Sequence, residues 1–301
     1  MTFRTSTLWI ALAFFGCTHF DGPSDIGVGN LNNTDSPPPQ PPSTEPIEPP
    51  VVGVDPPQPL ISRGLMARYM INEDTSGTDT TIVRDFGNSP VDMDVVYDNG
   101  GDQFVEINGH RGVQFRGLSD SHGLFCPGDE NKFERQIQNE TQFTFETVID
   151  IQDIQRGSRI MYLGQKDESG LIQISIPPDE NRISMGWRRV QRVVEWPLDY
   201  KSFGRMTLTF VIDFSHPDVE QRVRFYLNGG RINPINSPNI PENQVLDYFD
   251  ANETLMVLAN SATQDDAIEG IYYYAGFYNT ALTDNEILSN ANRLLLDDDT
   301  P

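Results

Sequence analysis

Short runs of alternating apolar and polar residues dominate the chain from residue 61 onward. In QFTFETVIDI, residues 142–151, bulky apolar side chains fall on one face and the residues between them on the other, which is typical of a half-buried β-strand. RMTLTFVIDF, residues 205–214, repeats this pattern. Shorter runs of the same kind are residues 159–164, 170–176, 182–187, 223–230 and 254–260.

The segments between these runs carry turn residues. Asn-Gly-Gly at residues 228–230 follows one run directly, and Asn and Gly tolerate the positive φ of tight hairpin turns. Long helical patterns are not interleaved, so we predict an all-β fold, an antiparallel jelly-roll sandwich. One short C-terminal helix is predicted over residues 283–296, because Thr283 and Glu286 have the spacing of a capping box and an apolar stripe follows.

The N-terminus has a different pattern. Residues 8–15 form a strongly apolar run, far shorter than the roughly 20 residues that a membrane-spanning helix needs. The run follows a Thr/Ser-rich start with one cation, Arg4, which is the order of a secretory signal peptide. The alternative, a buried core element, would be separated from its domain by residues 21–60. That segment is rich in Pro, Asn, Ser and acidic residues, and its composition predicts an extended tether.

The apolar run ends in FFGC, Phe14 to Cys17, which resembles the processing box of bacterial lipoprotein precursors. Gly16 and Cys17 match the box, whereas Phe14 stands where Leu is usual and Phe15 where a small residue is usual. The resemblance implies cleavage before Cys17 and acylation of Cys17, which would anchor the protein to a membrane. Thr18, rather than Asp, follows the Cys, which favours the bacterial outer membrane or cell surface. The alternative is an ordinary secreted protein.

These features divide the chain into four parts. We predict a lipoprotein signal peptide (residues 1–16), a disordered Pro-rich tether (17–60), the folded domain (61–297) and a short acidic tail (298–301).

The net charge limits the possible partners. The chain has 44 Asp and Glu against 21 Lys and Arg, a formal charge of −23. This charge repels phosphate backbones and anionic head groups, so no nucleic-acid partner is expected. Cys126 is the one cysteine besides Cys17, and its apolar neighbours indicate a small buried filler more than a nucleophile.

Four segments resemble, in chain order, the laminin G-like branch of the concanavalin A-like lectin/glucanase fold. The segments are GLMARYMINED (64–74), VRDFGNSPVDMDV (83–95), VRFYLNGG (223–230) and AGFYNTALTDNEI (275–287). The last two of these segments carry the resemblance most specifically. The resemblance implies a concanavalin A-like jelly roll, a fold that carries lectins, sugar-binding modules, glycosidases and adhesion domains, so the function has to come from the sites.

One catalytic hypothesis follows from the resemblance. Laminarinase-type members of this fold use carboxylates at alternate positions of one strand, which can flank a glycosidic bond. Glu146 and Asp150 share such a face, but Val148 stands between them where that family has Asp. We interpret this face as a solvated strand face and assign no catalytic residue, with Glu146 and Asp150 as a weak alternative.

A calcium site is a second possibility. The resemblance places Asp85 and Asn88 in the turn where the family often gathers cation ligands, and Asp92 and Asp94 follow closely. Ca²⁺ needs several oxygen ligands. This chain has Tyr273 near the closing strand, where members often carry Asp. Calcium is therefore a candidate cofactor, and a solvated acidic loop is the alternative.

A basic and aromatic segment, GWRRVQRVVEW, is the candidate ligand-binding surface. It contains Trp187, Arg189, Arg192 and Trp196, and Tyr273 on a late strand is a further candidate. Trp and Arg favour recognition surfaces because they offer stacking area and fixed donors. The alternative is that the tryptophans are core or edge aromatics and the arginines pair with the surplus carboxylates.

We therefore expect a lipid-anchored extracytoplasmic binding or adhesion module that recognises a carbohydrate or a surface protein. A polysaccharide or cell-wall hydrolase and a structural envelope subunit are the alternatives.

Overall fold

A computed structural model gives the structure of the protein. It describes residues 58–98, 101–117, 121–126, 132–154, 157–165, 172–177, 181–187, 194–236, 239–247, 254–261, 264 and 266–300. The predicted signal peptide, Cys17 and nearly all of the predicted tether lie outside the described residues, as do Arg189 and Arg192.

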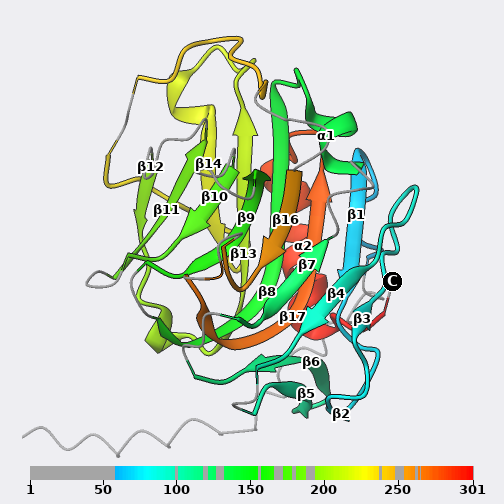
Figure 1. Ribbon diagram of the computed structural model, residues 1–301. Helices are drawn as coiled ribbons and strands as arrows, with labels where there is room; N and C mark the ends of the chain where they lie inside the picture. Colours follow the sequence, from blue (N-terminus) through cyan, green and yellow to red (C-terminus); the bar gives the residue numbers. More distant parts are fainter. Residues whose placement is uncertain are drawn as a thin grey trace, which may run out of the picture. The chain divides into compact units, whose positions relative to one another are not determined.

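Two antiparallel sheets form a sandwich (Figure 1). The first sheet has the order β15 (Gly230–Ile232), β14 (Val223–Leu227), β13 (Arg205–Asp213), β8 (Gln142–Ile154), β17 (Ile268–Tyr278), β6 (His110–Phe115), β5 (Gln103–Ile107) and β2 (Ser76–Gly77), and β1 (Leu65–Met70) also pairs with β17. The second has the order β12 (Val194–Pro197), β11 (Arg182–Trp187), β10 (Ile172–Ser175), β9 (Arg159–Gln165), β16 (Thr254–Leu258), β7 (Gly123–Cys126), β4 (Met93–Val96) and β3 (Ile82–Val83). This architecture confirms the predicted all-β antiparallel sandwich.

Aromatic side chains fill the space between the two sheets. Phe210 of β13 stacks on Phe225 of β14 with the ring centroids 4.7 Å apart. Phe145 of β8 and Phe277 of β17 have their centroids 5.0 Å apart. All four are completely buried, as the period-two pattern predicts for the inner face of a sheet.

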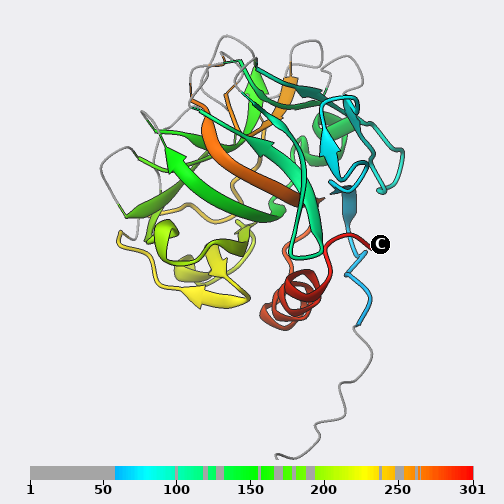
Figure 2. The same cartoon turned by 90° about the horizontal axis from the view of Figure 1, so that it is seen from below.

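The outer face of the first sheet is partly covered by α2 (Asp284–Leu296), as Figure 2 shows. Thr283 and Glu286 form the predicted capping box, in which the Thr283 hydroxyl accepts from the Glu286 amide and the Glu286 carboxylate accepts from the Thr283 amide. Ile287 of α2 packs against Val211 and Tyr226 of the sheet. The sequence pattern did not predict α1 (Lys132–Ile137). No helix among the described residues has the length and apolar character to cross a membrane.

Three consecutive tyrosines of β17 are buried because the strand has a β-bulge. Tyr272 pairs with Ile149 of β8 and Tyr274 pairs with the next residue, Val148, so Tyr273 is the extra residue. Tyr272 faces the core between the sheets, whereas Tyr273 and Tyr274 both face the outer side that α2 covers. The bulge thus lets β17 bury aromatic rings on both faces.

Acidic residues at the C-terminus fold back against the first sheet. The Asp298 carboxylate is completely buried and lies 2.5 Å from Nη2 of Arg205 and 2.8 Å from Nδ1 of His110. The Asp299 carboxylate lies 3.1 Å from Nε of Arg111. Residues 298–300 of the predicted acidic tail therefore contact the folded domain.

Candidate ligand-binding site

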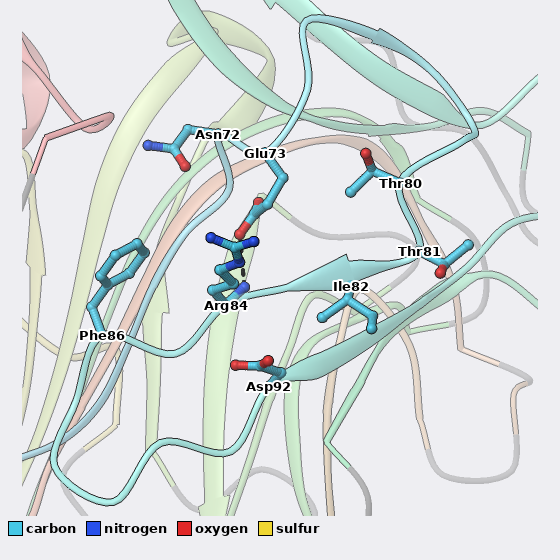
Figure 3. Close-up of a pocket in the computed structure, with 8 residues that line it drawn as sticks. All are labelled: Asn72, Glu73, Thr80, Thr81, Ile82, Arg84, Phe86 and Asp92. Atoms are coloured by element: carbon cyan, nitrogen blue, oxygen red, sulfur yellow. Dashed lines mark hydrogen bonds between the residues drawn. The ribbon is translucent and has the colours of Figure 1, made fainter.

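A cavity of about 620 Å³ opens beside β3, between the end of β1 and the start of β4 (Figure 3). Eight residues from one short region of the chain line it: Asn72, Glu73, Thr80, Thr81, Ile82, Arg84, Phe86 and Asp92. Polar side chains outnumber the apolar ones, and Phe86 and Ile82 are exposed, at 45% and 46%. The wall is therefore mixed: it offers both hydrogen-bonding groups and apolar contact area.

The carboxylate of Asp85 fixes the backbone of this region. Its Oδ1 accepts from the amides of Arg68 and Gly87 at 3.0 and 2.7 Å, and its Oδ2 accepts from the Val91 amide at 3.0 Å. The ammonium group of Lys132 forms a buried ion pair with the same Oδ2. Because Asp85 points inward, its neighbours along the chain point outward, and this places Arg84 and Phe86 in the cavity wall.

Glycine is required at position 87, where the loop crosses β1. An added Cβ atom would lie inside contact distance of the Met66 carbonyl oxygen and 2.7 Å from Cα of Ala67. Both are backbone atoms that cannot move aside. The close approach brings the Asp85 turn against β1, and so brings the two walls of the cavity together.

The predicted calcium ligands are not gathered around one point. The oxygens of Asp85 accept from nitrogen donors, and Oδ1 of Asp92 accepts from the Asp85 amide at 3.0 Å. Asn88 donates to the Leu65 carbonyl at 3.4 Å, and Asp94 is exposed on β4. Within the described ranges, no group of three His, Cys, Asp or Glu side chains could hold a metal ion. Calcium binding stays a prediction.

Glu73 and Arg84 supply two charged groups of the cavity wall. Oε1 of Glu73 accepts from the Arg84 amide at 2.7 Å, but Oε2 of Glu73 is buried and accepts no hydrogen bond. Burial raises the pKa of Glu73, and backbone amides and the nearby Arg84 guanidinium oppose this rise. Arg84 itself is exposed, and its guanidinium makes no ion pair or hydrogen bond with the part of the chain that the structure describes.

This combination can bind a small polar ring. The Arg84 guanidinium and the Thr81 hydroxyl can donate, the Asp92 carboxylate can accept, and the exposed face of Phe86 offers apolar contact. Figure 3 shows Glu73, Arg84 and Asp92 directed toward the same space, with Phe86 at its side. A polyhydroxylated ligand has matching groups, because each hydroxyl both donates and accepts.

The predicted ligand-binding aromatics are buried elsewhere in the fold. Trp196 on β12 is completely buried and lies 5.6 Å from Phe225 between ring centroids, and Trp187 on β11 lies 5.4 Å from Phe214. Tyr273 is covered at the bulge of β17. These three rings offer no stacking face to a ligand, which corrects that expectation in favour of the core alternative. The physical reason is strand periodicity, which turns both tryptophans toward the opposite sheet.

The candidate catalytic pair does not line the cavity. Glu146 is completely buried, and its Oε2 accepts from Nδ2 of Asn290 in α2 at 3.1 Å. Burial raises the pKa of Glu146 to about 7, against the opposing effect of the Asn290 hydrogen bond and of Arg68. Val148 packs in the apolar cluster beside α2, and Asp150 is half-buried. The expected solvated face is therefore wrong at Glu146, because α2 covers it.

Of the eight residues that line the cavity, sequence reasoning named only Asp92 and missed the other seven, among them Asn72, Glu73, Arg84 and Phe86. One signal was available. The turn VRDFG places Arg84 and Phe86 on either side of Asp85, so an inward Asp85 implies two outward side chains, one cationic and one aromatic. Asn72 and Glu73 carry no such signal, because only the folded chain brings the end of β1 beside β3.

No family model and no curated protein sequence matches this chain. Among solved structures, the chain is similar to botulinum neurotoxin type C, from work on its interaction with two ganglioside molecules (TM-score 0.52, 14% identity, 77% of this chain and 51% of that chain). It is also similar to the binding domain of botulinum neurotoxin DC in complex with SialylT (TM-score 0.51, 14% identity, 77% of this chain and 52% of that chain). A third similar structure is Trypanosoma rangeli sialidase with the inhibitor DANA (TM-score 0.50, 14% identity, 77% of this chain and 33% of that chain).

The chain thus spans about half of the toxin structures and a third of the sialidase. At this level of identity the similarity shows the fold alone, a jelly-roll-like sandwich of two sheets.

Proposed function

We propose that the chain is a carbohydrate-binding module and that the cavity between Asn72 and Asp92 is its sugar site. One observation carries the proposal: a single cavity combines the exposed ring of Phe86, the exposed guanidinium of Arg84 and the exposed carboxylate of Asp92. Sugar sites need an apolar surface for the ring face and fixed polar groups for the hydroxyls. The toxin domain of similar fold, bound to SialylT, is in keeping with this proposal.

The N-terminal sequence supports a location for this module. A lipid on Cys17 would hold the protein at a bacterial outer membrane or cell surface, and the Pro-rich residues 17–60 would hold the sandwich away from the bilayer. Detergent-phase partitioning of the full chain tests the anchor. Cys17→Ser is expected to move the protein to the aqueous phase, and unchanged partitioning contradicts lipidation.

A glycan array with the full chain tests the sugar site. Phe86→Ala and Arg84→Gln are expected to reduce binding at least tenfold, because the first removes the apolar ring and the second removes the charged, exposed donor. Phe203→Ala is the matched control, since Phe203 is also 45% exposed but is not among the residues that line the cavity. Binding that survives both cavity substitutions contradicts the proposed site.

The same array separates the alternatives. A ligand that is a surface protein, or a purely structural role in the envelope, predicts no glycan binding. A polysaccharide hydrolase predicts shortening of the bound glycan with time, which a binding module does not cause.

A further inference from the structure

We infer that this cavity selects uncharged sugars and discriminates against sugars that carry a carboxylate, such as sialic acid. The inference rests on the proposed function and specifies its ligand class. It starts from the charged groups in the wall, which are two carboxylates, Glu73 and Asp92, and one guanidinium, Arg84.

The two carboxylates have different partners. Glu73 and Arg84 lie close enough for the guanidinium to stabilise the ionised carboxylate, so these two charges offset each other. Oδ1 of Asp92 accepts one backbone amide, and Asp92 has no ion pair with any described residue. Asp85, which lies between Arg84 and Phe86 in the chain, is already paired with Lys132. Asp92 therefore leaves the cavity with an excess of negative charge.

The carboxylate of Asp92 can accept a donor from the ligand. Asp92 is exposed, and within the described residues its carboxylate accepts one hydrogen bond, from the Asp85 amide to Oδ1. A sugar hydroxyl can donate to Asp92 while another accepts from Arg84. An ionised carboxylate has no proton to donate, so a sugar that places its carboxylate beside Asp92 cannot form this hydrogen bond.

Repulsion acts in the same direction. A carboxylate drawn to Arg84 would enter the cavity beside Glu73 and Asp92, and would approach a chain of net charge −23. Salt screens this repulsion, since the Debye length is about 10 Å at 0.1 M ionic strength and about 3 Å at 1 M. The discrimination should therefore weaken as the salt concentration rises.

The experiment uses the full chain on an array of matched glycan pairs that differ only in a terminal sialic acid. We expect the uncharged member of each bound pair to bind at least tenfold more tightly at low salt, and the ratio to fall at 0.5 M salt. Stronger binding of the sialylated members overturns the inference but leaves the proposed function in place. Binding of neither member of any pair overturns the proposed function itself, and this inference with it.

Two variants locate the discrimination in the cavity. Asp92→Asn keeps the acceptor for the Asp85 amide but removes the charge. We expect it to strengthen the binding of the sialylated glycans, and so to reduce severalfold the ratio of uncharged to sialylated affinity. Asp94→Asn, an exposed carboxylate on β4 outside the cavity lining, is the control and should leave the ratio unchanged. Equal effects of the two substitutions would show that overall charge, and not the cavity, sets the selectivity, and would overturn the inference.

Discussion

Glu146 of β8 accepts a hydrogen bond from Asn290 of α2, with 3.1 Å between Oε2 and Nδ2, at a site where both side chains are completely covered. Oδ1 of Asn290 in turn accepts from the Ile61 amide at 2.9 Å. One amide side chain therefore joins the sheet, the C-terminal helix and the first residues of the folded domain.

The pH dependence of stability should show the burial of Glu146. Its pKa is about 7 in the folded protein, well above the ordinary value of 4.5. The folded state therefore holds the proton more tightly than the unfolded state, so the contribution of this group is complete below pH 4.5 and is lost as the pH rises through about 7. One pKa unit corresponds to about 1.4 kcal/mol, so the loss is about 3 kcal/mol.

Glu146→Gln removes this titration and retains an acceptor for Asn290. We expect the variant to match the wild type near pH 4.5 and to exceed its free energy of unfolding by about 3 kcal/mol at pH 8. Urea denaturation at both pH values measures this difference. A constant difference between the two proteins across this range would show that Glu146 does not titrate in it.

Asn290→Ala removes the donor and leaves the Glu146 carboxylate buried with fewer partners. An unsatisfied buried group costs about 1–3 kcal/mol. We expect a loss of this size, larger at pH 8 than at pH 5, because the ionised carboxylate needs the donor more. Asn285→Ala, on the exposed side of the same helix, is the control for helix propensity and should change stability by only about 0.5 kcal/mol or less. Equal losses in the two variants would contradict the role of the Asn290 hydrogen bond.

Local patterns predicted the elements of this fold more successfully than the surfaces between them. The period-two runs at residues 142–151 and 205–214 became β8 and β13, and the capping box of Thr283 marked the start of α2. These signals depend on neighbours within a few positions. The covering of Glu146 by α2 depends on residues 144 positions apart, so no local pattern contains it.

The aromatic residues show the same limit. A cluster of Trp and Arg in the sequence suggests a binding surface, but Trp187 and Trp196 fall on inward-facing strand positions, and the β-bulge at Tyr273 changes which face each tyrosine occupies. A single inserted residue reverses every later side chain of a strand. The cavity residues Glu73 and Arg84 lie in loops whose positions are set by the Asp85 turn, which composition alone does not reveal.

Asp298 should be the most important residue of the C-terminal segment. Its carboxylate is completely buried and is shared by Arg205 and His110. Removing one partner of a buried ion pair costs about 3–5 kcal/mol, because the remaining charge loses its compensation. Asp298→Ala is therefore expected to lower the free energy of unfolding by about this amount, measured by urea denaturation. Asp79→Ala, at an exposed carboxylate, is the control and should have little effect; a similarly small effect at Asp298 would contradict the buried pair.

The C-terminal segment also supports one wall of the cavity. The Asn72 side chain donates to the Asp299 carbonyl at 2.5 Å, and Arg111 donates to the Asn72 carbonyl at 2.8 Å while its Nε lies 3.1 Å from the Asp299 carboxylate. Arg111→Met removes these charged contacts but keeps the apolar, unbranched part of the side chain, and position 111 lies outside the cavity lining. We expect glycan affinity to fall severalfold with a loss of only about 1 kcal/mol in stability, since Arg111 is partly exposed. Unchanged affinity in a folded variant would show that Asn72 does not need this support.

Gly87 provides the sharpest test of how the cavity is built. Gly87→Ala places a methyl group against backbone atoms of Met66 and Ala67, and overpacking of this kind costs about 1–3 kcal/mol. The turn must move away from β1, which shifts Phe86 and the Asp85 hydrogen bonds together, so we expect both lower stability and loss of glycan binding. Gly230→Ala is the matched control, because a Cβ atom there would meet only the Leu227 carbonyl oxygen at 3.4 Å, an ordinary contact. If Gly87→Ala lowered stability but left glycan affinity intact, the sugar site would have to lie away from the Asp85 turn, and the cavity beside β3 would no longer be the candidate.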